Sequence, residues 1–161
     1  MADSDNAPPT PGTPPSPGTP PAPAPSAPLT DDDRLWGLLA HVLALTGFVI
    51  PFGSVVGPAV AYFVRKDQSK FARFHAIQSF AFQVAVLVVV AFLAVFMILV
   101  SVVTARLGML LFVPVYFLIG LGWLIYVIYM GLKANKGEFP KYPIVGEWAY
   151  KKVYEQDWKP V

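Results

Sequence analysis

Three long uncharged segments, separated by a few charged positions, dominate the pattern of the chain. They cover residues 35–64, 76–105 and 107–132 and are 30, 30 and 26 residues long. Each is longer than the roughly 18 apolar residues that mark a candidate for crossing a membrane. The pattern therefore excludes a water-soluble fold and predicts an all-α, polytopic membrane protein.

The first uncharged segment is too long and too interrupted to form one uniform helix. At about 1.5 Å per residue it would reach about 45 Å, whereas the hydrocarbon core of a bilayer is about 30 Å thick. Proline and glycine weaken helices, and this segment carries a helix break at Gly47, Pro51, Gly53, Gly57 and Pro58. We expect two short helices, at about 32–49 and 55–66, joined at 51–53. A hairpin is the preferred arrangement, and one kinked span is the alternative.

The other two uncharged segments predict a pair of long helices, at about 71–99 and 107–133. Because the link between them is short, the two helices should be antiparallel neighbours. The expected fold is thus a helical bundle with two short broken helices and a long antiparallel pair. It occupies residues 31–136, between a tail at 1–30 and a tail at 137–161.

The two tails differ in composition. Residues 1–30 contain 11 of the 17 prolines, so this tail should be disordered, and it serves either as a spacer or as a ligand for a proline-binding domain. Residues 137–161 combine lysines with aromatic rings, a mixture that favours the headgroup zone of a bilayer. We expect a surface-lying helix at 144–156 and anchoring aromatic side chains at Phe139, Tyr142, Trp148, Tyr150, Tyr154 and Trp158.

The charged residues indicate an orientation and exclude several classes of function. Basic residues gather at 65–73 and after position 132, and such clusters remain on the cytoplasmic side. The sequence therefore predicts a multi-pass protein of the bacterial inner membrane with both termini in the cytoplasm. A net charge of +2 is too small to indicate a nucleic-acid-binding surface. The lack of cysteine excludes disulfides and thiolate metal sites.

Few polar side chains lie inside the predicted helices, and most of them share one helical face. They are His41, His75, Gln78, Ser79 and Gln83. Three interpretations compete: hydrogen bonds that hold helices together, a wet vestibule or conducting path, and a metal site of two histidines. The metal site is the weakest, since the chain offers no Cys and no carboxylate within a membrane span to complete four ligands. The sequence contains no catalytic set and predicts no enzyme, no metal and no cofactor.

Several strings along the chain resemble a small bacterial four-helix membrane-protein family of unassigned function. The resemblance rests on Trp36, His41 and the residues 47–53, on Arg65-Lys66-Asp67-Gln68-Ser69 with His75 and Gln83, and on Lys133-Ala134-Asn135 with Tyr142-Pro143. That family is similar to the Tic-type import-channel subunit of the chloroplast inner envelope. The resemblance implies four helices and termini on the same side of the membrane; it implies no import activity.

These observations favour a non-enzymatic membrane subunit that packs with itself or with other membrane proteins. A translocon-like role in transport or insertion follows only from the resemblance. The alternative function is an oligomeric conduit or transporter for a small solute, because one copy offers too few polar residues to line a pore. Besides these, the expected partners are the lipid bilayer and a proline-binding domain at the N-terminal tail.

Overall fold

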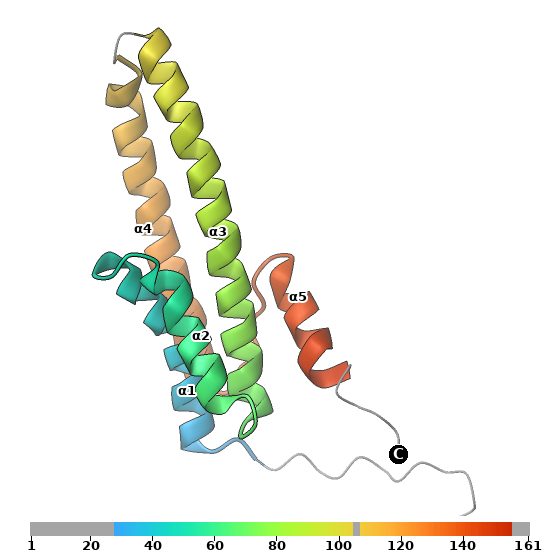
Figure 1. Ribbon diagram of the computed structural model, residues 1–161. Coiled ribbons are helices and arrows are strands. Elements are labelled where there is room, and N and C mark those ends of the chain that lie inside the picture. Colours follow the sequence, from blue (N-terminus) through green and yellow to red (C-terminus); the bar gives the residue numbers. More distant parts are fainter. Residues whose placement is uncertain (1–27, 105–106, 156–161) are drawn as a thin grey trace, which may run out of the picture.

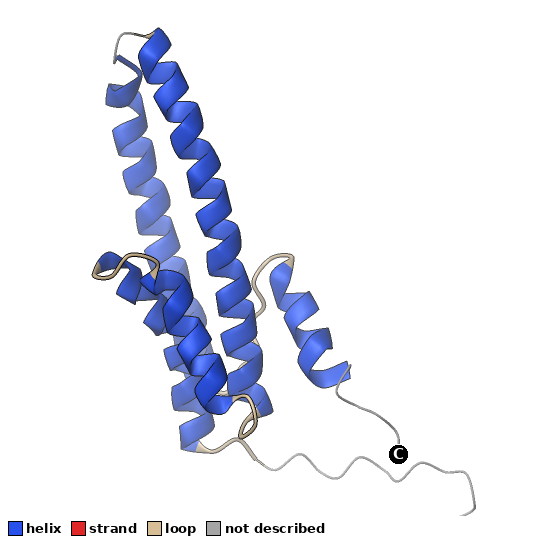
Figure 2. Ribbon diagram, viewed as in Figure 1, coloured by secondary structure: helices blue, strands red, loops and turns tan. Residues whose placement is uncertain are grey.

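The computed structural model describes residues 28–104 and 107–155, and these residues form helices and no strand. The helices are α1 (Asp31–Val42), the 3-10 helix η1 (Leu43–Phe48), α2 (Gly53–Arg65), α3 (Lys70–Val103), α4 (Leu107–Asn135), α5 (Val145–Tyr150) and the π-helix η2 (Lys151–Glu155). Figures 1 and 2 show α3 and α4 as a long pair, with the shorter helices packed around one half of it. The proline-rich stretch at 1–27 lies outside the described residues.

Local sequence signals explain where the first helix of each hairpin begins. Thr30 caps α1, because its hydroxyl accepts a hydrogen bond from the Asp33 amide at 3.1 Å and the Asp33 carboxylate accepts one from the Thr30 amide at 3.0 Å. Ser69 caps α3 in the same way through the Ala72 amide. Both capping residues satisfy amides that a helix start leaves unpaired.

The segments α1, η1 and α2 form a hairpin, as the sequence favoured. The chain turns at 49–52, where Phe52 has a φ of 60°. The far ends of the hairpin meet through an ion pair of 2.6 Å between Arg65 and Asp32. The turn is shorter than the predicted break, because Gly57 and Pro58 do not belong to it; they are buried inside α2.

Glycines allow the two arms of this hairpin to approach each other closely. A Cβ atom on Gly57 would lie 2.6 Å from the carbonyl carbon of Leu43, and one on Gly53 would lie 2.6 Å from that of Thr46. The Thr46 hydroxyl lies within hydrogen-bond distance of the Leu43 and Gly53 carbonyls, at 2.7 and 2.8 Å, and shares its one hydrogen between them. Gly53 and Gly57 thus allow the backbones of the two arms to pack closely within one chain.

Among the described residues, two helices are long and apolar enough to cross a membrane. They are α3, with 34 residues, and the part of α4 from Phe112 to Asn135. The helices α1 and α2 have only 12 and 13 residues, which corresponds to about 18 and 20 Å against a hydrocarbon core of about 30 Å. The structure therefore supports an all-helical protein with two candidate spans, which is coarser than the four-helix, polytopic bundle expected from the sequence.

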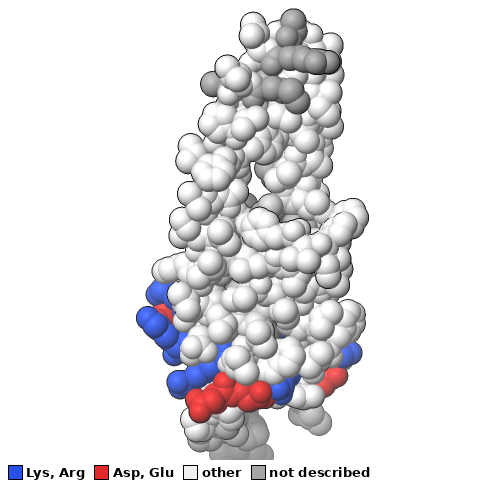
Figure 3. Space-filling view, turned by 90° about the vertical axis from the view of Figure 1, so that its left-hand side faces the viewer, with Lys and Arg blue, Asp and Glu red and all other residues white. Residues whose placement is uncertain are grey.

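Burial divides the long helices into two halves. The first turns of α3 are buried against α1, α2 and α5, with Phe71, Phe74 and Ala76 at 0–2% exposure. Beyond Gln83, most side chains of α3 and of the facing part of α4 are exposed and apolar. The charged residues gather at the opposite end of the molecule, on the face shown in Figure 3. The described chain thus has two parts. The packed, charged base consists of α1, η1, α2, α5, η2, the segment between α4 and α5, and the turns of α3 and α4 that these contact. The apolar extension is the rest of α3, beyond Gln83, with the facing part of α4.

Candidate functional site

The polar residues that the sequence singled out lie in the packed base. His41 comes from α1, whereas His75, Gln78, Ser79 and Gln83 come from α3, and all five are at most 1% exposed. His41, His75 and Gln78 meet one further side chain, Tyr142, from the segment that follows α4. We call these four residues the polar core: His41, His75, Gln78 and Tyr142.

Gln78 binds the segment after α4 through both atoms of its amide. Its nitrogen donates to the Pro140 carbonyl at 3.0 Å, and its oxygen accepts from the Tyr142 amide at 3.3 Å. A proline carbonyl can only accept and a backbone amide can only donate, so the orientation of the Gln78 side chain is fixed. The second hydrogen of the Gln78 nitrogen then points to the Nδ1 atom of His75, 3.1 Å away.

The proton positions of the two histidines follow from this amide. Because His75 Nδ1 accepts from Gln78, it carries no hydrogen, and the neutral ring of His75 is protonated at Nε2. His41 Nε2 lies 3.0 Å from the same unprotonated Nδ1 atom and donates to it, so the two donors share its single lone pair. His41 Nδ1 is then an acceptor, and the Tyr142 hydroxyl donates to it at 3.2 Å. One directed set of hydrogen bonds joins α1, α3 and the segment after α4.

The position of Tyr142 corrects a prediction. The sequence placed its ring in the headgroup zone, but the side chain is only 1% exposed and stacks on Phe82 with ring centroids 4.0 Å apart and planes 5° apart. The chain returns to the base through Gly137, whose φ of 80° ends α4. Tyr142 is the member of the polar core that the search for polar residues within the predicted helices did not find. Its only signal in the sequence was the Tyr142-Pro143 pair within the family resemblance.

Gln83 and Ser79 do not join the polar core. The Gln83 oxygen accepts a hydrogen bond of 3.1 Å from the Trp123 indole on α4. Its amide nitrogen and the Ser79 hydroxyl have no hydrogen-bond partner within the described part of the chain. Gln83 also lines a cavity of about 330 Å³ between η1, α2, α3 and α4, together with Ser54 and Tyr116. The residues of the predicted polar face therefore lie at two separate places, the polar core and the cavity at Gln83.

Most hydrogen-bonding atoms of the polar core are already occupied by other protein atoms. In the polar core, protein atoms occupy the amide of Gln78, both nitrogens of His41 and Nδ1 of His75. The lone pairs that a metal would need thus point at hydrogen-bond donors. Among residues 28–104 and 107–155, no group of three or more His, Cys, Asp or Glu side chains is placed to hold a metal ion.

Tyr142 makes the stability of this base sensitive to high pH. Burial, with a smaller effect of the neighbouring Tyr126, raises the pKa of Tyr142 above its ordinary value of 10.0. Above pH 10 the unfolded chain therefore loses this proton while the folded chain retains it, and the free energy of unfolding falls as the pH rises.

We expect Tyr142→Phe to reduce this alkaline loss of stability, measured as the melting temperature in detergent between pH 8 and 12. At pH 8 the variant should lose about 1 kcal/mol, because only the hydrogen bond to His41 disappears while the stack on Phe82 remains. Tyr129→Phe, at a half-exposed position on α4, is the matched control. Identical pH profiles for Tyr142→Phe and the unmodified protein would contradict the assignment.

Comparison with known proteins identifies one family. The chain matches the magnetosome magnetite crystal formation protein family over residues 32–149, from α1 to α5. No curated protein and no solved structure matches. The match confirms the expected kind of family, a small bacterial membrane-protein family, and it shows no similarity to Tic-type subunits.

Proposed function

The chain belongs to the magnetosome magnetite crystal formation protein family, and from this we propose that it acts in crystal formation as a non-enzymatic membrane subunit. The observation that carries the proposal is the contrast between the two halves of the molecule. The base is closed by buried hydrogen bonds, whereas the 18-residue window of each candidate span is only 6% buried. A surface of this kind suits association with lipid and with other helices.

The apolar extension offers positions where another helix can approach closely. Phe92 on α3 and Phe117 on α4 are 74% and 69% exposed. Gly120 and Gly122, on α4, have no heavy atom within 4 Å of an added Cβ atom. Close approach of backbones at glycine is a common way for helices to associate in lipid. The partner in this proposal is a second copy of the chain or another protein of the same membrane.

We place the charged base at the cytoplasmic surface of a bacterial membrane, with both termini in the cytoplasm. In this arrangement α3 and α4 cross the bilayer, and the α1–α2 hairpin enters it from the cytoplasmic side without crossing. The hairpin tip suits such a position, because its side chains at 48–50 and 52 are exposed and apolar. Its amides at 49, 50 and 53 find acceptors within the tip itself, at 2.9–3.0 Å.

Photo-crosslinking in intact membranes tests the proposed association. We expect a photoreactive phenylalanine analogue at Phe92 or Phe117 to give crosslinks to a second protein chain. The same analogue at Phe74, which is buried in the base, is the control and should give crosslinks within one chain only. If positions 92 and 117 yield lipid adducts and monomers alone, the subunit proposal is wrong.

A second candidate function, an oligomeric conduit for a small solute, draws on the cavity at Gln83. The Gln83 nitrogen and the Tyr116 hydroxyl are buried and have no hydrogen-bond partner in the described ranges, and both residues line this cavity. A polar solute passing between copies could satisfy these groups. If the protein is a conduit, vesicles reconstituted with it should leak solute. The rate of leak should fall in Gln83→Leu and should remain unchanged in Ser79→Ala. Vesicles that stay tight would contradict it.

Two further proposals come from the sequence. The proline-rich tail at 1–27, outside the described residues, would add a proline-binding partner. A translocon-like kinship would add a role in insertion or transport. Both concern partners beyond the base and the apolar extension, and neither is required by the subunit proposal.

A further inference from the structure

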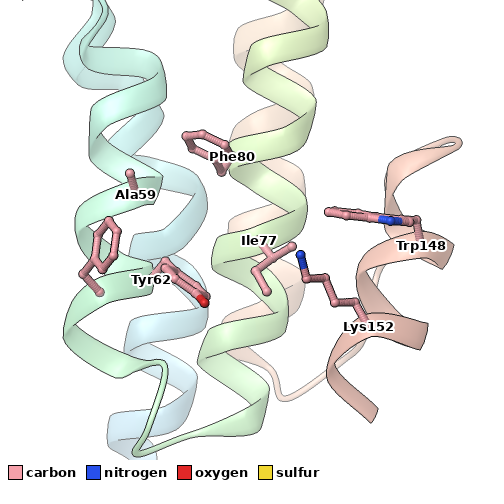
Figure 4. Close-up of a pocket in the computed structure, with 7 residues that line it drawn as sticks. Ala59, Tyr62, Ile77, Phe80, Trp148 and Lys152 are labelled. Carbon is pink, nitrogen blue, oxygen red and sulfur yellow. The ribbon is translucent and has the colours of Figure 1, made fainter. Parts of the chain in front are cut away.

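A groove opens between α2, α3 and α5, next to the charged base. Its volume is about 280 Å³, and it is lined by Ala59, Tyr62, Phe63, Ile77, Phe80, Trp148 and Lys152. Figure 4 shows Lys152 extending from its helix toward Ile77, with its nitrogen between Ile77 and the Trp148 ring. The groove is therefore an apolar slot with a single ammonium group in its wall.

Lys152 lacks the ion pair that three other basic side chains of the base form with described carboxylates. Arg65, Lys133 and Lys141 each lie 2.6–2.7 Å from a carboxylate oxygen. The nitrogen of Lys152 lies 4.9 Å from the centre of the Trp148 ring, and it forms no ion pair with any carboxylate that the structure describes. The Lys152 side chain is exposed, so an anionic headgroup can reach its ammonium group.

The rim of the groove has the composition of a bilayer interface. Phe63, Phe80 and Trp148 are 69%, 39% and 51% exposed. Exposed apolar side chains of α2 and α3 thus form part of the groove lining. Tryptophan and lysine together are typical of the headgroup level, and basic pockets between helices on the cytoplasmic side bind anionic headgroups.

We propose that this groove binds one anionic phospholipid. An acyl chain fills the slot along Ala59, Phe63 and Phe80, and the lipid phosphate accepts a hydrogen bond from the Lys152 ammonium group. The charge of Lys152 selects an anionic lipid over a zwitterionic one, because only the former leaves the pair without excess charge. The site lies outside the polar core and shares no lining residue with the cavity at Gln83.

Lipid retention by the purified full-length protein tests the proposal. The protein in detergent is mixed with equal amounts of phosphatidylglycerol and phosphatidylcholine, and bound lipid is counted by native mass spectrometry. We expect the unmodified protein to retain phosphatidylglycerol preferentially, and Lys152→Gln to lower that retention about fivefold, as expected for one basic residue near a lipid surface.

The matched control is Lys151→Gln, which removes the same charge at the neighbouring exposed position. Lys151 does not line the groove, so this variant should retain the lipid as the unmodified protein does. Equal losses in the two variants would show a general attraction to positive charge and would overturn the proposal. So would equal retention of the two lipids by the unmodified protein.

A third variant tests the acyl-chain part of the site. Ala59→Phe places a ring in the slot and leaves every charge unchanged, so retention of phosphatidylglycerol should fall although Lys152 is present. Unchanged retention in a variant with the helix content of the unmodified protein would overturn the slot as the binding place. If Ala59→Phe loses its helix content, the comparison of Lys152→Gln with Lys151→Gln decides alone.

Discussion

Gly57→Ala is expected to open the α1–α2 hairpin and to lower the free energy of unfolding by about 3 kcal/mol, the upper part of the usual range for overpacking. A Cβ atom at this position would lie 2.6 Å from the carbonyl carbon of Leu43 and 2.9 Å from its Cβ atom. The first of these neighbours is backbone in the facing arm, which cannot move aside as a flexible side chain could. The arms must therefore separate.

Gly120→Ala is the control for this experiment, because it makes the same change in α4 where nothing lies within 4 Å of the new atom. Alanine favours a helix over glycine by about 1 kcal/mol, so this variant should be as stable as the unmodified protein or slightly more stable. The measurement is unfolding by denaturing detergent, followed by circular dichroism. Equal stabilities of Gly57→Ala and Gly120→Ala would show that the two arms are not in contact.

The second large effect is expected for Gln78→Leu. The amide of Gln78 is the partner of the Pro140 carbonyl and of the Tyr142 amide. Leucine has a similar size but leaves both backbone groups without a partner, and each such group costs about 1–3 kcal/mol when buried. We expect a loss of about 3 kcal/mol and the release of the segment between α4 and α5.

Limited proteolysis distinguishes release of that segment from general unfolding. Cleavage between Gly137 and Ile144 should become faster in Gln78→Leu, while cleavage within α3 and α4 remains slow. Ser79→Ala is the control: it also removes a buried polar group, but the Ser79 hydroxyl has no hydrogen-bond partner in the described structure. If Ser79→Ala destabilises the protein as much as Gln78→Leu, the hydrogen bonds of Gln78 are not the cause.

The positions of the helices could be predicted because each depends on local sequence. Uncharged runs, the Thr30 cap and the turn at Pro51 are all visible in short windows, and the ends of α3 and α4 lie within four residues of the expected ones. Gly57 and Pro58 were assigned to the break because such residues weaken an isolated helix. The actual role of Gly57 depends on the facing arm, where the absence of a Cβ atom permits contact with Leu43.

The candidate site was predictable only in part, because its other half is distant in sequence. The spacing of His75, Gln78, Ser79 and Gln83 indicated a shared helical face, but not which element covers each turn of that face. The turn with His75 and Gln78 contacts His41 and Tyr142. The turn with Gln83 contacts Trp123 on α4. Tyr142 is 101 residues from His41, and no local pattern marks an aromatic ring as the donor to a buried histidine.

This separation has a consequence for how the protein is made. Ribosomes release the α1 segment well before the residues around Tyr142, so the newly made His41 ring lacks its phenolic partner throughout synthesis of α3 and α4. Until the last turns of the chain emerge, the nascent protein must shield that imidazole with water or with the insertion machinery. In chains truncated before Tyr142, the Nδ1 atom of His41 would thus lack its phenolic hydrogen-bond partner.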